Sequence, residues 1–120
     1  MNRLTPVVVA GISDARQVVM GTSYGCVRRS SGALACWGGN AYGQLGDGTN
    51  IDRTMAVPVT GITDAVDVSA ATFAIYVDQP VTCAARASGS VLCWGYGGYG
   101  QLGDGSTAPR TSPVAVVGLP

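Results

Sequence analysis

The chain has 120 residues and contains an internal repeat, which limits the possible folds more than any other feature. The segment CWGGNAYGQLGDGT at 36–49 recurs as CWGYGGYGQLGDGS at 93–106, an offset of 57. Upstream, GISDA at 11–15 matches GITDA at 61–65 at an offset of 50, so the second copy has seven additional residues, at about 74–80. A period near 50 with Gly-rich turns is typical of the four-stranded blade of a β-propeller.

Each repeat is predicted to contain four short strands, which in the first copy lie at about 7–10, 17–20, 25–29 and 33–37. The hairpin turns are expected at 30–32 and 87–89, with Gly where φ must be positive. We divide the chain into a first repeat (1–56), a second repeat (57–112) and the first strand of a third (113–120). The predicted fold is all-β: two four-stranded antiparallel blades plus one extra strand, part of a larger ring or of a ring completed by oligomerisation.

The composition is consistent with this fold and argues against catalysis. All seven basic residues are Arg, all seven acids are Asp, and there is no His. The chain therefore lacks two good surface helix formers, and it lacks the commonest general base and metal ligand. We expect no enzyme activity and no cofactor. A formal net charge of zero gives no reason to expect nucleic acid or an anionic membrane as a partner, and no apolar run approaches the ~20 residues of a membrane span.

The four cysteines form two pairs with the same spacing. Cys26 and Cys36 are ten positions apart, as are Cys83 and Cys93, and each pair lies on the two strands of one predicted hairpin. Opposed positions in a hairpin are close enough for a disulfide. We therefore expect one disulfide per repeat and an extracellular or cell-surface location. Four buried, reduced cysteines are the alternative.

The repeated loop residues are interpreted as structural. They are Trp37, Tyr42, Gln44, Asp47, Trp94, Tyr99, Gln101 and Asp104. A ring repeats its packing in every blade but rarely repeats an active site, so the aromatic rings are expected to fill space between blades and each Asp to bind backbone N–H groups in a turn. An aromatic binding surface for sugar or peptide is the alternative. A calcium loop is not expected, because no acid stands where the bidentate ligand is needed.

Residues that do not repeat are the candidates for contact with a partner: Phe73, Tyr76, Asp78 and Tyr96. Loops carry function more often than strands do, and exposed aromatic residues are enriched at protein interfaces. The insertion at 74–80 is the main difference between the two copies, and neutral variation in a surface loop is the alternative reading of it.

The pattern Trp-Gly-x3-Tyr-Gly-Gln-Leu-Gly-Asp-Gly-Thr/Ser, followed by Arg and Pro-Val-x-Val-x-Gly, resembles the regulator of chromosome condensation repeat. Cysteines on both strands before Trp-Gly resemble bacterial members of that family. The resemblance implies a propeller of about seven blades, so this chain is either part of a longer propeller or a homo-oligomer. The family's Gly-x-His step is absent here, since Gly21-Thr22-Ser23-Tyr24 and Ala71-Thr72-Phe73 stand in its place.

The resemblance and the missing His together lead us to expect a non-catalytic module that binds another protein, of unknown identity, outside the cytoplasm. Two alternatives belong to other classes. One is guanine-nucleotide exchange on a small GTPase, which is the activity of the family's namesake. The other is glycan binding through the non-repeating aromatic residues. Fold resemblance alone does not choose among them.

Overall fold

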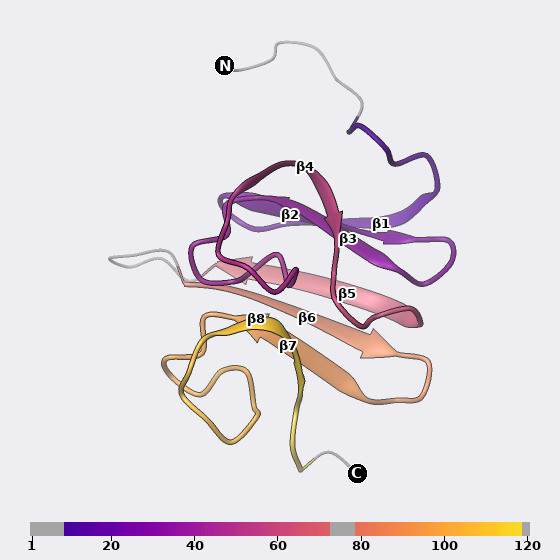
Figure 1. The fold of residues 1–120 in the computed structure, drawn as a ribbon. Coiled ribbons are helices and arrows are strands. Elements are labelled where there is room, and N and C mark those ends of the chain that lie inside the picture. Colours follow the sequence, from indigo (N-terminus) through magenta and orange to yellow (C-terminus); the bar gives the residue numbers. More distant parts are fainter. Residues whose placement is uncertain (1–8, 73–78, 119–120) are drawn as a thin grey trace.

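Eight strands form two separate four-stranded antiparallel sheets, one for each sequence repeat (Figure 1). The structure is a computed structural model that describes residues 9–72 and 79–118. The first sheet, here called the first blade, consists of β1 (Ala15–Met20), β2 (Tyr24–Arg29), β3 (Leu34–Gly38) and β4 (Arg53–Pro58), paired in that order. The second blade consists of β5 (Ala65–Thr72), β6 (Pro80–Arg86), β7 (Val91–Gly95) and β8 (Arg110–Ala115), again in sequence order.

The two four-stranded antiparallel blades agree with the prediction, but their strands are taken from different parts of the chain. The expected strand at 7–10 is not found at residues 9 and 10, and residues 7 and 8 lie outside the described ranges. The fourth strand of each blade comes instead from the segment after the Gly-rich loop. As a result β8 pairs with β7 and completes the second blade, so it is not an extra strand. The physical reason is that the loop turns the chain back onto β3 or β7, whose outer edge would otherwise stay unpaired.

Each blade has a tight hairpin at its centre that is held by a disulfide. Gly32 and Gly89 occupy the turns with φ of 91° and 92°, a conformation that residues with a Cβ rarely adopt. Cys26 and Cys36 are register partners, as are Cys83 and Cys93, and in each pair the Cα atoms are 4.1 Å apart. Both pairs are disulfide-bonded in the structure.

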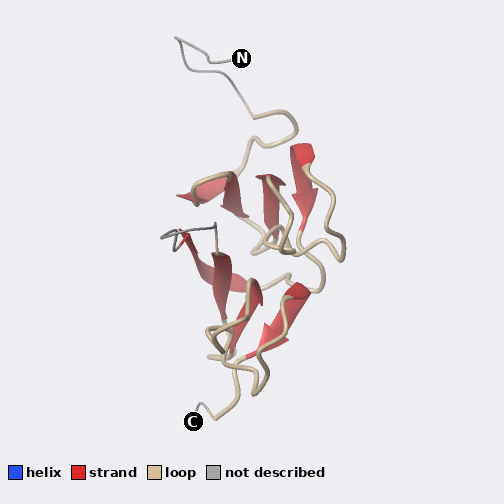
Figure 2. Ribbon diagram, turned by 90° about the vertical axis from the view of Figure 1, so that its left-hand side faces the viewer, coloured by secondary structure: helices blue, strands red, loops and turns tan. Residues whose placement is uncertain are grey.

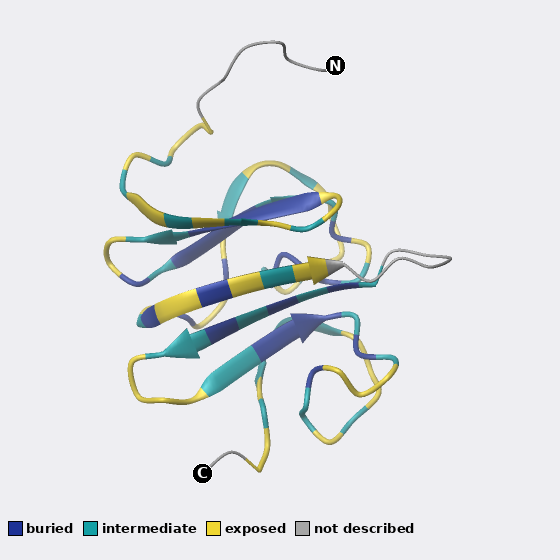
Figure 3. Ribbon diagram, turned by 180° about the vertical axis from the view of Figure 1, so that it is seen from behind, coloured by how far each residue is buried: buried dark blue, intermediate teal, exposed yellow. Residues whose placement is uncertain are grey.

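The two blades stack face to face, with the N-terminal and C-terminal ends of the chain at opposite ends of the stack (Figure 2). Buried residues gather where the blades meet (Figure 3). The core comprises Tyr24, Cys26, Leu34, Cys36, Leu45, Val59, Ile62, Ala65, Val68, Ala84 and Trp94. It draws on both blades and on the segment that joins them, so the hydrophobic core of this chain lies between its sheets.

Candidate functional site

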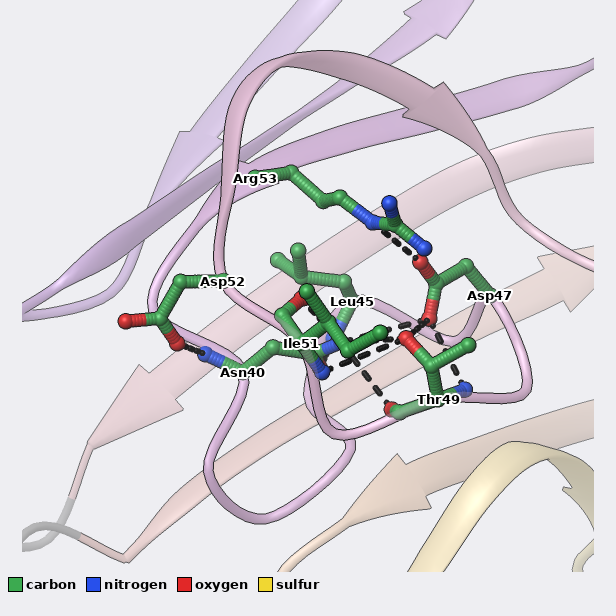
Figure 4. Close-up of polar contacts among 7 residues, drawn as sticks. All are labelled: Asn40, Leu45, Asp47, Thr49, Ile51, Asp52 and Arg53. Atoms are coloured by element: carbon green, nitrogen blue, oxygen red, sulfur yellow. Dashed lines mark hydrogen bonds and ion pairs between the residues drawn. The ribbon is translucent and has the colours of Figure 1, made fainter.

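The loop between β3 and β4, residues 39–52, is organised around the buried side chain of Asn40 (Figure 4). The Asn40 amide nitrogen donates to the carbonyl oxygens of Thr49 and Ile51, both at 3.0 Å. The Asn40 side-chain oxygen accepts the backbone N–H of Leu45 at 3.0 Å. A single amide thus holds the two ends of the loop together. Asn40 was not predicted from the sequence because it is not repeated: the equivalent position in the second copy is Gly97.

Asp47 fixes the second half of this loop, which we call the first loop. Its carboxylate accepts the Thr49 backbone N–H at 3.0 Å, the Thr49 hydroxyl at 2.8 Å and Arg53 Nε at 3.0 Å. Burial by itself raises the pKa of Asp47, but these hydrogen bonds outweigh burial and hold the pKa below its usual value. In the equivalent second loop, residues 96–109, Asp104 accepts from Arg110 Nε at 2.8 Å, and this hydrogen bond is the main reason that the pKa of Asp104 is lowered.

The first loop lies against the second blade. The carbonyl oxygen of Gln44 accepts the indole N–H of Trp94 at 2.9 Å, and it lies 2.9 Å from the Thr82 hydroxyl. Gly46 also lies against this indole, with φ of 71°, and a Cβ there would come within 2.6 Å of Trp94 Nε1. The repeated Gly-Gln-Leu-Gly segment of one blade therefore covers the tryptophan of the next blade.

Tyr24 completes this junction from the first blade. Its hydroxyl donates to the carbonyl oxygen of Val81 at 2.9 Å and lies 2.8 Å from the Thr82 hydroxyl. Burial raises the pKa of Tyr24 to about 12, since the phenolate would lose its hydration. Three side chains and two backbone carbonyl groups thus form a polar cluster in an otherwise apolar interface. Tyr24 and Thr82 carried no sequence signal because neither residue is repeated.

The second loop has the same local form, but in the described part of the chain no further sheet lies against it. The Tyr99 backbone N–H donates to the Gln101 side chain at 2.8 Å, as that of Tyr42 does to Gln44 at 2.9 Å. Gln44 is 2% exposed, whereas Gln101 is exposed to solvent. The repeated motif residues are therefore equivalent in sequence but not in environment.

Three tyrosines gather where the two loops approach each other. The rings of Tyr42 and Tyr96 meet edge to face with centroids 5.2 Å apart, and those of Tyr96 and Tyr99 have centroids 6.0 Å apart. Tyr99 is 75% exposed. The structure thus unites a predicted partner residue, Tyr96, with two residues assigned to packing, and we call these three rings the tyrosine cluster. The other predicted partner residues, Phe73, Tyr76 and Asp78, lie outside the described residues.

Most of the charged side chains in the described residues form ion pairs. The same Arg–Asp arrangement occurs in both blades: Arg29–Asp14, Arg53–Asp47, Arg86–Asp64 and Arg110–Asp104. Within residues 9–72 and 79–118, no group of three or more His, Cys, Asp or Glu side chains is placed to hold a metal ion. The same ranges contain no helix long and apolar enough to cross a membrane.

Two stacked four-stranded sheets in sequence order, with a loop of one sheet packed on the next, define consecutive blades of a β-propeller. The pattern described as the regulator of chromosome condensation (RCC1) repeat matches residues 15–44 and 88–120, just over half of the chain. The chain belongs to the RCC1 repeat family.

Relatives and solved structures agree with this assignment. The human probable E3 ubiquitin-protein ligase HERC4 is 34% identical over 103 residues, covering 86% of this chain and 9% of the ligase. The human ligase HERC2 is 30% identical over 101 residues, covering 82% of this chain and 2% of the ligase. Human WBSCR16 superposes with a TM-score of 0.75 at 20% identity, and Prp20p from Saccharomyces cerevisiae with 0.74 at 13%. The chain spans 28% and 27% of those two structures and so corresponds to part of their propellers.

Proposed function

We propose that this chain is a non-catalytic module that binds another protein through the tyrosine cluster. The observation that carries the proposal is Tyr99, a residue that is 75% exposed while its ring stays in edge contact with that of Tyr96. Tyrosines held by their neighbours lose little side-chain entropy on binding, which is why they are enriched at protein interfaces. Tyr96 replaces the Gly39 of the first copy, so the cluster is specific to this pair of blades.

The chemistry of the side chains supports a role without catalysis. A general acid at neutral pH needs a carboxyl group whose pKa is raised. Here hydrogen bonds hold the pKa of Asp14 and of Asp104 below the usual value, mainly through Arg29 and Arg110. The cysteine sulfurs are held in disulfides, so they are not available as nucleophiles. The disulfides also favour a location outside the cytoplasm.

Solved structures of relatives make a protein the preferred class of partner. The crystal structure of Prp20p was determined together with its binding properties to Gsp1p and histones, and a second crystal structure has Kap60 bound to yeast RCC1. Those partners belong to propellers of which this chain matches about a quarter. Nucleotide exchange on a small GTPase is the second candidate, and a nucleotide-release assay with a purified small GTPase tests it directly: accelerated release would contradict a non-catalytic role.

The binding proposal is tested by comparing three immobilised proteins: the wild type, Tyr96→Ala and the control Val66→Ala. Val66 is 53% exposed and lies at the end of β5 away from Ala71, which shares a cavity with Tyr99. Proteins retained from extracellular and surface fractions of the source cells are identified by mass spectrometry, purified and titrated against each variant. We expect a partner whose affinity falls at least ~10-fold with Tyr96→Ala only. Equal binding to all three proteins would refute the tyrosine cluster as the site, and retention of glycans alone would support the glycan alternative.

A further inference from the structure

The two-blade stack ends in two different sheet faces, and we propose that these faces dock head to tail between copies of this chain. The partner is a second copy, and the contact repeats the blade–blade contact already present within the chain. Self-association through these faces does not rest on partner binding at the tyrosine cluster. The contact uses Met20 and Trp37 of the first blade and, at the other end of the stack, the second loop, which carries Tyr99 of the tyrosine cluster.

The open face of the first blade is equivalent to the buried face of the second blade. In the second blade this face carries Val68, Ala70, Thr82, Ala84, Leu92 and Trp94, linked by strand register. At the matching positions the first blade has Val18, Met20, Gly25, Val27, Ala35 and Trp37, linked by the same register. We call the latter set the acceptor face, because its counterpart receives the first loop.

Exposure shows that the acceptor face is open at Val18 and Met20, whereas Val27 and Ala35 on the same face are buried. Val68 is 3% exposed and Trp94 is fully buried, whereas Val18 is 57% exposed and Met20 61%. The indole N–H of Trp94 donates to Gln44. Among the described residues, the indole N–H of Trp37 has no such acceptor. Val18 and Met20 lie two residues apart on β1, and Met20 shares its register row with Trp37 through Gly25. Exposed apolar side chains of this size, next to an available donor, form a surface suited to covering by another blade.

The opposite end of the stack presents a loop already shaped to cover such a face. Gly100 and Gly103 have φ of 75° and 68°, close to the 78° and 71° of their counterparts in the first loop. Leu102 is fully buried, as Leu45 is, so the second loop is folded before any partner arrives. Its Gln101 stands where Gln44 stands in the first loop. A preformed loop loses little conformational entropy on docking.

The two open ends differ from the internal junction by changes that compensate each other. Inside the chain, Tyr24 reaches Thr82, whose register partner is the small Ala70. We call the outer face of the second blade, together with the second loop, the donor end. There Val81 stands at the position of Tyr24 in the repeat. A cavity of about 390 Å³ lies beside Val81 and is lined also by Ala71, Gln79, Tyr99 and Gln101.

At the acceptor end Met20 replaces Ala70 and Gly25 replaces Thr82. A Cβ on Gly25 would come within 2.7 Å of Met20 Sδ, so the methionine lies over the glycine. The bulk missing beside Val81 is thus present at Met20, and the hydroxyl pair of the internal junction is absent from both ends together. This match of volume and polarity between the two ends of one sequence is the reason to choose a second copy as the occupant.

The geometry also sets the kind of assembly. Donor and acceptor lie on opposite ends of the stack, so each contact is heterologous and leaves one of each face free (Figure 2). Such contacts give a closed ring if the rotation closes, and an open filament otherwise. Exchange of the last strand between chains is not needed, since β8 already pairs with β7 in its own sheet.

Sedimentation velocity of the full chain over micromolar to millimolar concentrations tests the proposal with Met20→Asp and the control Val66→Asp. Both changes place a carboxylate on an exposed apolar position, but Val66 is unpaired in the strand register and belongs neither to the acceptor face nor to the lining of the cavity beside Val81. We expect the mass of the wild type and of Val66→Asp to rise with concentration. Association of Met20→Asp is expected to be at least ~10-fold weaker, because a carboxylate would be buried without a partner. A wild type that stays monomeric, or equal behaviour of the two variants, would overturn the proposal.

A complementary pair keeps the test independent of folding defects. Val81→Tyr restores the tyrosine of the internal junction at the donor end and is expected to weaken self-association by meeting Met20. Copies carrying Met20→Ala with Gly25→Thr restore the Ala70–Thr82 arrangement at the acceptor end. Mixing the two variants should restore association in mixed complexes. Failure of the mixture to associate more strongly than Val81→Tyr alone would refute the proposed register of docking.

Discussion

The two tryptophans occupy the same position in the repeat, so they offer a matched test of how the blades are held together. Trp94 is fully buried, and its indole N–H donates to Gln44 O at 2.9 Å. Trp37 is only partly buried, and no residue in the described part of the chain accepts its N–H. We predict that Trp94→Phe lowers the free energy of unfolding by about 2–3 kcal/mol and that Trp37→Phe lowers it by less than about 1 kcal/mol.

The loss of stability predicted for Trp94→Phe has two parts. Loss of the hydrogen bond costs about 1 kcal/mol, close to the net value, because Gln44 O keeps the Thr82 hydroxyl at 2.9 Å and is not left unsatisfied. Replacing indole by phenyl empties roughly 40 Å³ of a closed site, which at ~24 cal/mol per Å³ adds about 1 kcal/mol before any lost transfer free energy. At Trp37 solvent reaches the ring, so no closed cavity forms.

Urea denaturation followed by far-ultraviolet circular dichroism measures both values without relying on the fluorescence of the mutated residues. The protein concentration is kept at the lowest usable value so that chains are not associated, and reducing agents are omitted. An unchanged dependence on urea concentration is required for the comparison. Equal losses for the two variants, or a greater loss for Trp37→Phe, would refute the conclusion that the first loop selectively buries the second tryptophan.

Other predictions concern charge and covalent bonds. The raised pKa of Tyr24 means that the neutral phenol stabilises the fold below the unfolded value of ~10, and that this stabilisation is lost as pH rises toward about 12. Tyr24→Phe should remove that alkaline loss in urea titrations, and an unchanged slope would contradict the assignment. The lowered pKa of Asp47 gives stability that is present above ~3.9 and lost as pH falls through the lower folded value, so Asp47→Asn should reduce the difference in stability between neutral and acid pH. At neutral pH the same change should cost about 1–3 kcal/mol, because the buried amide can neither pair with Arg53 nor accept every bond. Replacing Cys83 and Cys93 by Ala should cost about 2–3 kcal/mol, as expected for a ten-residue loop, while reducing agent should then have a smaller effect on the variant than on the wild type.

Much of the architecture is encoded locally and was therefore predictable from the sequence. The repeat identified two four-stranded blades, because the Gly positions that allow tight turns recur with the apolar strands between them. The hairpin turns fall at Gly32 and Gly89 as expected. The spacing of the cysteines matched the hairpin register, since residues ten apart across a three-residue turn stand opposite each other.

The assignment of the strands to the two sheets could not be predicted from the sequence. A repeat can be cut at any point, and the sequence contains no mark that separates the end of one blade from the start of the next. Hydrogen bonding decides it: β4 and β8 return to β3 and β7 because the loop before each of them brings it to that free edge. This is a long-range pairing, and local propensity does not encode it.

The family, the blade motif and the paired cysteines could be recognised in the sequence because they follow from local patterns that occur twice. Which copy of each motif is buried depends on how the blades pack against each other. Trp94 and Gln44 are in contact inside the stack, whereas Trp37 and Gln101 lie at its two ends. The two tryptophans, and likewise the two glutamines, nevertheless occupy the same position in the repeat. Burial at these positions comes from contacts between blades, and the described residues form one such contact, between the first blade and the second.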